Sequence, residues 1–414
     1  MLDIKTIREN TEAVKSAAKH KSIEVDIDSL LSLDKQKREL QQQIDELRTK
    51  RNELSGKSKG GKPEPSDIEA GKKLKQQIAE LESEFASVSD SLLEEQSRVP
   101  NLISDDTPIG GEEANKQIAE WGDTAKSDAI DHLQWLTDRK LVDFERGAKV
   151  SGSKFYYSMG ALAELEMALI QYALMVCRKH GFTQIQVPNL VKEKVVDGAG
   201  FAPRGEESQI YGVEGEDLKL IATAEIPLTG LFMDEIINLD DGPQLFVAFS
   251  PCYRQEAGAY GKHSRGLYRN HQFYKVEMYV YCKPAESAEW HEKLRAIEEE
   301  IYQGLEIPYR VVINASADLG APAFRKYDIE YYSAVDGEFR ELSSCSNVTD
   351  YQARRMNVRY KNGDGETQMV HTLNGTAIVS SRGPIAIIEN HQQSDGSVKL
   401  PAVLEPFMSQ LVLQ

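Results

Sequence analysis

Residues 246–281 read FVAFSPCYRQEAGAYGKHSRGLYRNHQFYKVEMYVY. Both ends of this stretch, 246–249 and 273–281, are rich in β-branched and aromatic residues, which favour β-strands. A long loop of charges and glycines separates them, and Arg254 and Arg269 flank it at the strand ends. The stretch therefore predicts two strands of a sheet joined by a charged loop.

The segments around this pair mix helices with short strands. Residues 161–180 are typical of a helix that ends near Gly181, residues 183–187 of a strand stopped by Pro188, and residues 285–304 of another helix. Strand-rich segments dominate the second half without a regular alternation of strands and helices. This order predicts an α+β body built on an antiparallel sheet.

The first hundred residues have a different pattern. A short helical segment over 1–22 is followed by two runs with apolar residues at heptad spacing, separated by the turn-rich stretch 55–65. Two such runs around a turn predict an antiparallel coiled-coil hairpin. The apolar positions are Leu33, Leu40, Ile44, Leu47 and Leu54, then Leu74, Ile78, Leu81, Phe85, Val88 and Leu92.

The charge of this hairpin departs from that of the whole chain. The 414 residues carry a formal net charge of −17, which argues against general binding to nucleic acid. Residues 35–75, however, hold twelve basic and seven acidic side chains. Two interpretations stay open on charge alone: an ordinary solvated coiled-coil face, or a limb that contacts a nucleic-acid backbone.

Cysteine spacing and hydropathy place the protein in a reducing, aqueous compartment. The four cysteines form no CxxC pair, so no zinc site is expected, and they suit buried free thiols. No apolar run approaches the roughly 18 residues that a membrane span needs. The charged start, Met1-Leu-Asp-Ile-Lys, is not a signal peptide. We expect a cytoplasmic protein that binds neither membranes nor DNA.

Polar residues on the predicted strands indicate a binding site. Phe273 and Glu277 lie four apart on one strand and so face the same side, where an aromatic ring and a carboxylate suit a base and an amine or hydroxyl. Arg254 and Arg269 can bind phosphate or carboxylate in a bidentate way. A charged hairpin loop with a core phenylalanine is the alternative. The chain has neither a GxxxxGK(S/T) nor a GxGxxG loop, so a P-loop or Rossmann site is not expected.

Taken together, the polar clusters resemble the three signature motifs of class II aminoacyl-tRNA synthetases, in order, and in particular the bacterial-type seryl-tRNA synthetases. Residues 181–188 resemble motif 1, Arg254-Gln-Glu256 with the loop to Glu277 resembles motif 2, and 374–390 with Arg382 resembles motif 3. Thr223-Ala-Glu225, residues 341–347 and 352–355, the first ten residues and the hairpin also match. The resemblance covers nearly the whole chain.

The resemblance implies a fold and a division into domains. The sheet is expected to be flanked by helices, with the coiled-coil arm at about 27–98 inside a tRNA-binding domain over 1–100. A linker over 101–114 then leads to the catalytic domain over 115–414. The sequence departs from the family at Ala222, at Ser380-Ser381 and at Gly383-Pro384, and Thr376 stands where serine is frequent.

The resemblance also implies a reaction and its residues. L-Serine attacks the α-phosphate of ATP to give seryl-adenylate, and a tRNA hydroxyl then takes the seryl group. The catalytic residues are Arg254 and Arg382. The expected ATP-binding residues are Arg254, Gln255, Glu256, Arg269, Phe273, Glu341, Leu342, Ser343, Ser344 and Arg382, with Mg²⁺ on Glu341 and Ser344. The expected serine-binding residues are Thr223, Ala224, Glu225, Glu277 and Thr376.

The implied macromolecular partners are tRNA(Ser), with tRNA(Sec) as a second candidate, and a second copy of the chain in a homodimer. Candidates for tRNA contact on the arm are Arg48, Lys50, Arg51, Lys72 and Lys73. Two alternatives stay open: a catalytically silent homologue, and an enzyme that loads an amino acid onto a carrier protein. The presence of Arg254, Arg382, Glu225 and Glu277 argues against the first. The presence of the arm argues against the second.

Overall fold

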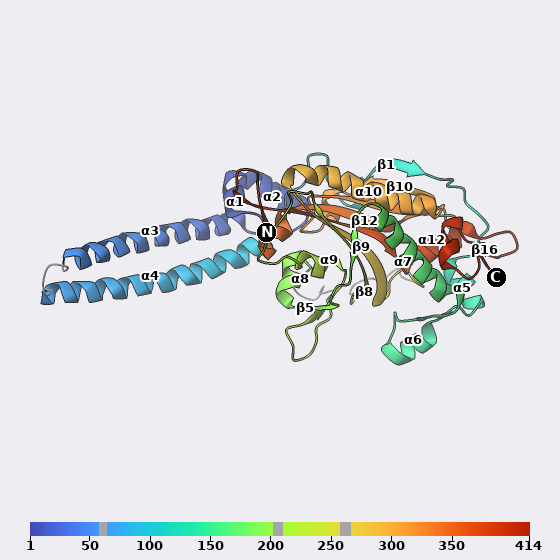
Figure 1. Cartoon of the computed structure of the whole chain (residues 1–414), viewed down its shortest axis with the longest axis horizontal. Coiled ribbons are helices and arrows are strands. Elements are labelled where there is room, and N and C mark those ends of the chain that lie inside the picture. The colour runs from blue at the N-terminus through green and yellow to red at the C-terminus, as the bar shows by residue number, and fades with distance from the viewer. Residues whose placement is uncertain (58–63, 202–209, 257–265) are drawn as a thin grey trace. The chain divides into compact units, whose positions relative to one another are not determined.

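The computed structural model describes residues 1–57, 64–201, 210–256 and 266–414 (Figure 1). The tip of the predicted hairpin and most of the charged loop after Glu256 lie outside the described residues. The chain divides into two compact units, Met1–Leu102 and Ile103–Gln414.

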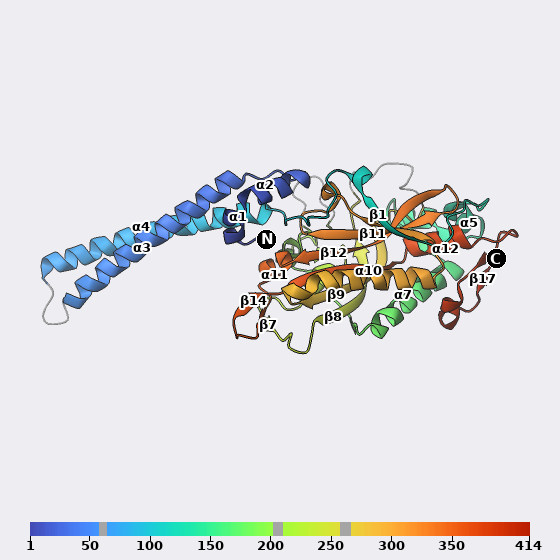
Figure 2. The ribbon, with the colours of Figure 1, turned by 90° about the horizontal axis from the view of Figure 1, so that it is seen from above.

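The first unit contains the predicted coiled-coil hairpin. Two short helices, α1 (Ile4–Glu9) and α2 (Thr11–His20), precede the long helices α3 (Ile27–Lys57) and α4 (Pro65–Arg98), which run antiparallel side by side (Figures 1 and 2). The heptad residues Leu40, Ile44, Ile78, Val88 and Leu92 are buried in the seam. The spacing prediction is confirmed, because each helix buries only a narrow apolar stripe and its partner covers it.

The second unit is built on the predicted antiparallel sheet. Within the described residues, eight strands pair in the order β1-β10-β11-β12-β15-β9-β8-β4, and only the last pair, β8 with β4, is parallel. In that order they are Lys116–Trp121, Tyr309–Ile313, Arg325–Ser333, Glu338–Thr349, His371–Val379, Gln272–Cys282, Gln244–Tyr253 and Thr183–Ile185. The two strands expected at 246–249 and 273–281 are β8 and β9, side by side.

Helices cover one face of this sheet. The helices α7 (Ala161–Lys179), α10 (Ser287–Gly304) and α12 (Arg382–His391) pack on it, and the main core lies between (Figure 2). On β9 the alternate residues Val276, Met278 and Val280 enter this core. Because side chains alternate along a strand, Phe273 and Glu277 project from the opposite face.

Smaller elements complete the second unit. The helices are α5 (His132–Asp138), α6 (Phe144–Ser151), α8 (Glu193–Ala199), α9 (Glu225–Thr229) and α11 (Tyr351–Met356). Short strand pairs join β2 (Val142–Asp143) to β3 (Tyr157–Ser158), β5 (Leu190–Val191) to β6 (Lys219–Leu220), and β16 (Val398–Lys399) to β17 (Val412–Leu413). A three-stranded sheet joins β14 (Thr367–Met369), β13 (Arg359–Lys361) and β7 (Ile236–Ile237). In the part of the chain described, no helix combines the length and apolar character needed to cross a membrane.

Candidate active site

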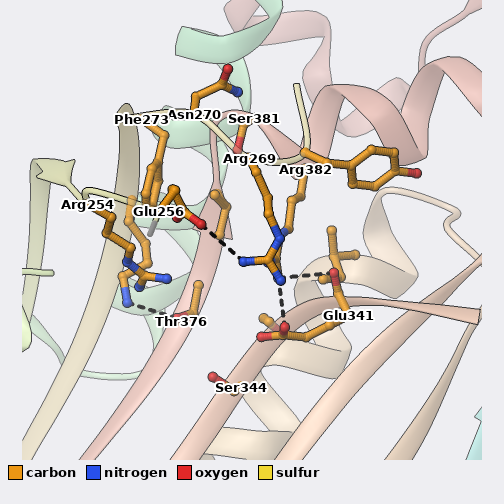
Figure 3. Close-up of a pocket in the computed structure, with 15 residues that line it drawn as sticks. Arg254, Glu256, Arg269, Asn270, Phe273, Glu341, Ser344, Thr376, Ser381 and Arg382 are labelled. Atoms are coloured by element: carbon orange, nitrogen blue, oxygen red, sulfur yellow. Dashed lines mark hydrogen bonds and ion pairs between the residues drawn. The ribbon is translucent and has the colours of Figure 1, made fainter. Parts of the chain in front are cut away.

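Two adjoining cavities open on the uncovered face of the sheet. Ten of the predicted residues, all from motifs 2 and 3 or from β12 and β15, line the first cavity together (Figure 3). They are Arg254, Glu256, Arg269, Phe273, Glu341, Leu342, Ser343, Ser344, Thr376 and Arg382. The second cavity is lined by Thr223, Glu225 and Glu277, among others. The two cavities share Arg254, Lys275, Ser344 and Thr376, so they are two parts of one site.

Strand geometry brings these residues to one face. Phe273, Lys275 and Glu277 alternate along β9, and Thr376 on the neighbouring β15 lies directly opposite Glu277. On β12, Glu341 and Ser344 are three residues apart, and a regular strand would turn them to opposite faces. The register with β11 shifts between these residues, so that Leu342 is an extra residue in β12. This bulge lets both side chains line the same cavity.

The arginines of the first cavity fall into two groups. The guanidinium of Arg254 lies over the ring of Phe273, 5.2 Å from its centroid, in a cation–π contact. Arg269 donates to the Glu256 carboxylate over 3.1 Å, and Arg382 lies 3.1 Å from the Glu341 carboxylate (Figure 3). Two arginines suited to phosphates are thus paired with two acids that the family motifs assign to ATP and to metal.

The pairing sets the charge of Glu341. Desolvation opposes ionisation of this carboxyl, but the positive charges of Arg382 and Lys326 outweigh it and lower the pKa of Glu341. The side chain is still 46% exposed to the cavity. The Glu341 carboxylate is therefore ionised, and its oxygens are open to the cavity.

Arg382 is held in place by its neighbours in motif 3. The Ser380 hydroxyl accepts a hydrogen bond from the backbone N–H of Tyr274 over 2.9 Å, which ties the start of α12 to β9. A side chain at Gly383 would meet Leu169 of α7 at 3.0 Å, so glycine allows the close packing of α12 on α7. Pro384 lies in the first turn of α12, where its missing N–H costs no helix bond. These contacts explain two of the departures from the family pattern.

The other end of α12 is anchored as firmly. The Glu389 carboxylate contacts His132 Nδ1 at 2.8 Å and accepts a hydrogen bond from the Ser333 hydroxyl over 2.7 Å. Burial opposes ionisation, but these partners lower the pKa of Glu389. The helix that begins with Arg382 is thus fixed at both ends.

The second cavity contains a buried acid, Glu225, whose side-chain partners in the described part of the chain are neutral amides. Glu225 Oε1 accepts hydrogen bonds from Gln352 Nε2 over 2.8 Å and from Asn374 Nδ2 over 2.9 Å. Burial, and next the negative charge of Glu277, raise the pKa of Glu225 to about 7. A ligand ammonium in this cavity would favour the carboxylate form.

The neighbouring acid, Glu277, is paired. Lys275 Nζ lies 2.5 Å from Glu277 Oε2 and donates to Thr376 Oγ1 over 3.2 Å. Thr376 in turn donates its hydroxyl proton to Glu277 Oε2 over 3.2 Å. The three side chains form a closed polar ring, of which Lys275 and Thr376 belong to the wall that the cavities share.

Some predicted residues lie outside the two linings, and some lining residues were not predicted. Ala224 is buried in a small apolar cluster, and the Gln255 amide donates to the Ile210 carbonyl. Ser343 lies at the lining, but its hydroxyl donates to the buried Glu298 over 2.7 Å. Lys275 and Asn374 were missed. The period-two spacing of Phe273, Lys275 and Glu277 was the available signal for the lysine.

Comparisons with known proteins identify the family of the chain. The profile of the "Seryl-tRNA synthetase N-terminal domain" matches residues 1–103, and that of the "tRNA synthetase class II core domain (G, H, P, S and T)" matches residues 211–391. The serine–tRNA ligase of Treponema denticola is 46% identical over 98% of both chains, and that of Dictyoglomus turgidum is 46% identical over 99% of this chain and 98% of its own. The chain belongs to the seryl-tRNA synthetase family.

Solved structures of the family place the same fold over the full length. Seryl-tRNA synthetase from Pyrococcus horikoshii, a structure with ATP, superimposes with a TM-score of 0.94 at 39% identity, over 100% of this chain and 99% of that one. The Naegleria fowleri enzyme, a structure with AMP, gives 0.89 at 27% identity over the same shares. The family and fold that the motifs predicted are therefore confirmed, and with them an ATP-dependent class II ligase.

Proposed function

We propose that this synthetase activates L-serine with ATP and transfers the seryl group to tRNA(Ser). The observation that carries the proposal is the pair of adjoining cavities with Arg254 in their shared wall. One cavity has the aromatic ring and arginines that suit a nucleoside triphosphate. The other has the carboxylates that suit a small amine with a hydroxyl.

In the first step, the serine carboxylate attacks the α-phosphate and pyrophosphate leaves. The substrate supplies the nucleophile, so the protein has to position the reactants and neutralise charge. Phe273 stacks on adenine and Glu256 accepts from its amino group. Arg254 contacts the α-phosphate and the serine carboxylate, and Arg269 and Arg382 bind the distal phosphates. Leu342 and Ser343 shape the floor at the β12 bulge.

The oxygen donors Glu341 and Ser344 would hold Mg²⁺. The bulge turns both to the cavity, and two protein oxygens together with substrate phosphates are the usual setting for this ion. Among the described residues, no group of three acidic, histidine or cysteine side chains is arranged as a metal site, which fits an ion held largely by its nucleotide. Bound there, Mg²⁺ would neutralise phosphate charge.

Beyond its carboxylate, serine offers two further polar groups for recognition, an ammonium and a hydroxyl. Thr223 and Glu225 take the ammonium, and Glu277 and Thr376 take the hydroxyl. Alanine would leave the buried Glu277 and Thr376 without that hydrogen bond, which is the basis for strong rejection. Threonine has the hydroxyl and is excluded only by size.

The coiled-coil arm is proposed to bind tRNA as part of a domain over 1–100, joined by 101–114 to the catalytic domain over 115–414. Arg48 bonds to Glu82 across the hairpin over 2.8 Å, whereas Lys50, Arg51, Lys72 and Lys73 are exposed. We propose that these four side chains contact the tRNA backbone and that Arg48 holds the two helices of the hairpin together. We also propose a homodimer, with tRNA(Sec) as a second substrate and the cytoplasm as the location.

A deletion of residues 35–95 tests this division of labour. Serine-dependent pyrophosphate exchange should stay nearly intact, since both cavities lie in the second unit, while charging of tRNA(Ser) and tRNA(Sec) should be abolished. A second variant with Lys50, Arg51, Lys72 and Lys73 changed to serine keeps the hairpin and should weaken charging through KM. Equal loss of exchange and charging in the deletion would contradict the proposal. Sedimentation of the full chain tests the dimer.

A further inference from the structure

The lysine beside Glu277 in the serine cavity, Lys275, has no role in the proposed reaction. Lys275 lies on β9, and its side chain is 9% exposed. It lines both cavities, together with Arg254, Ser344 and Thr376. Burying a lysine ammonium costs free energy of desolvation, so its position in the lining of both cavities needs an explanation.

We propose that Lys275 is a positioning residue that sets the orientation of the amino acid. Its ammonium compensates Glu277, so that the substrate ammonium is directed to Glu225 and the substrate hydroxyl to Glu277 and Thr376. This inference rests on the proposed serine site. It adds the group that makes Glu277 less attractive than Glu225 to a ligand ammonium.

The argument begins with an ambiguity in the cavity. Glu225 and Glu277 are both buried and line the same space, and each can attract a ligand ammonium. The partners of Glu225 are the neutral amides of Gln352 and Asn374, whereas Glu277 has a lysine ammonium 2.5 Å away. A second ammonium at Glu277 would meet like charge in a low-dielectric setting, and the repulsion disfavours that orientation.

The polar ring also fixes the direction of hydrogen bonds. Thr376 Oγ1 accepts from Lys275 Nζ and uses its only proton on Glu277 Oε2. The remaining lone pairs of Thr376 and Glu277 can then only accept. A ligand group at this end of the cavity has to donate without bringing a net positive charge, and a hydroxyl does so.

Two variants separate charge from hydrogen bonding. Lys275→Gln keeps a donor next to Glu277 and removes the charge, and Lys275→Met removes both. Lys275→Arg keeps the charge, and Lys293→Met, a change of an exposed lysine beside Trp290, is the matched control for loss of one surface charge. Purified proteins are compared by thermal unfolding before kinetics.

The readout is pyrophosphate exchange with serine, alanine and diaminopropionate, which carries an ammonium in place of the serine hydroxyl, at a pH where Glu225 is ionised and that side-chain amine is protonated. In Lys275→Gln and Lys275→Met, kcat/KM for diaminopropionate relative to serine should rise at least about tenfold, as expected for exposing an uncompensated buried carboxylate. The ratio should stay at the wild-type value in Lys275→Arg and Lys293→Met.

Three other outcomes separate a failure of this inference from a failure of the proposed function. If the neutral variants lose activity equally towards all three amino acids, at an unchanged ratio, Lys275 is only a structural ion-pair partner and the inference is overturned. If one neutral variant does not fold, the ratio in the other decides. If the wild-type protein does not activate serine, the proposed function fails first, and that failure is visible in the control before any variant is compared.

Discussion

Replacing Glu225 by glutamine should stabilise the unliganded protein while abolishing serine activation. Burial holds the pKa of Glu225 at about 7 in the folded chain, against 4.5 for an ordinary glutamate. Each pKa unit corresponds to about 1.4 kcal/mol, so the folded state loses up to about 3 kcal/mol in ionising this carboxyl. The glutamine oxygen can still accept from Gln352 and Asn374, so the hydrogen bonds survive and the ionisation cost disappears.

The pH dependence gives the sign of the effect. Since the folded pKa is raised, the protonated acid favours the folded state below about pH 4.5, and this advantage is lost as the pH rises towards 7. Urea unfolding without ligands should therefore show Glu225→Gln and wild type equally stable near pH 4.5. The variant should gain up to about 3 kcal/mol by pH 8. In wild type, kcat/KM for serine should fall about tenfold per pH unit below 7, because the carboxylate binds the ammonium.

Glu166 of α7 provides the matched control. Burial raises its pKa to about 7 as well, its carboxylate accepts from the Ser158 hydroxyl over 2.7 Å, and it lines neither cavity. Glu166→Gln should therefore show the same pH-dependent gain in stability with pyrophosphate exchange unchanged. A Glu225→Gln protein that is less stable than wild type at pH 8, or that still activates serine, would refute the reasoning.

Two further predictions follow from the same contacts. Glu341→Gln releases Arg382 from its ion pair, so calorimetry without metal should show pyrophosphate binding at least about tenfold more tightly. Pyrophosphate exchange in the presence of magnesium should fall at least about a hundredfold. Unchanged metal-free binding of pyrophosphate would show that the ion pair does not restrain Arg382. Cys177, Cys252, Cys282 and Cys345 are all buried and burial raises the pKa of each, so a thiol reagent should label none in the folded protein and four in urea; rapid labelling of any folded thiol would contradict this burial.

Periodic patterns predicted most of the fold that surrounds the site. The helix expected at 161–180 is α7, and the heptad residues form the α3–α4 seam, because a stripe at constant spacing has to be buried by something. The edge strand β1 was not predicted. Its pairing with β10 joins residues almost two hundred positions apart, and its own residues are mostly exposed, so no local pattern marks it.

The motifs named many of the residues that line the two cavities and missed others that only the geometry brings there. The bulge at Leu342 decides whether Glu341 and Ser344 share a face, and a break in alternation of one residue leaves no mark in composition. Lys275 was missed because a lysine inside a strand is usually at the surface. The Lys275 side chain is only 9% exposed, and no local pattern in β9 indicates this burial.

The most direct test of the central claim is amino-acid-dependent exchange of pyrophosphate into ATP, measured without tRNA, with magnesium and with each of the standard amino acids in turn. Exchange with serine alone is the predicted result, since serine matches Glu225 at one end of its cavity and Glu277 with Thr376 at the other, and threonine, which has the same polar groups, is too large. Exchange with a different amino acid, or no exchange by the folded protein with any of them, would contradict the assignment of these two cavities.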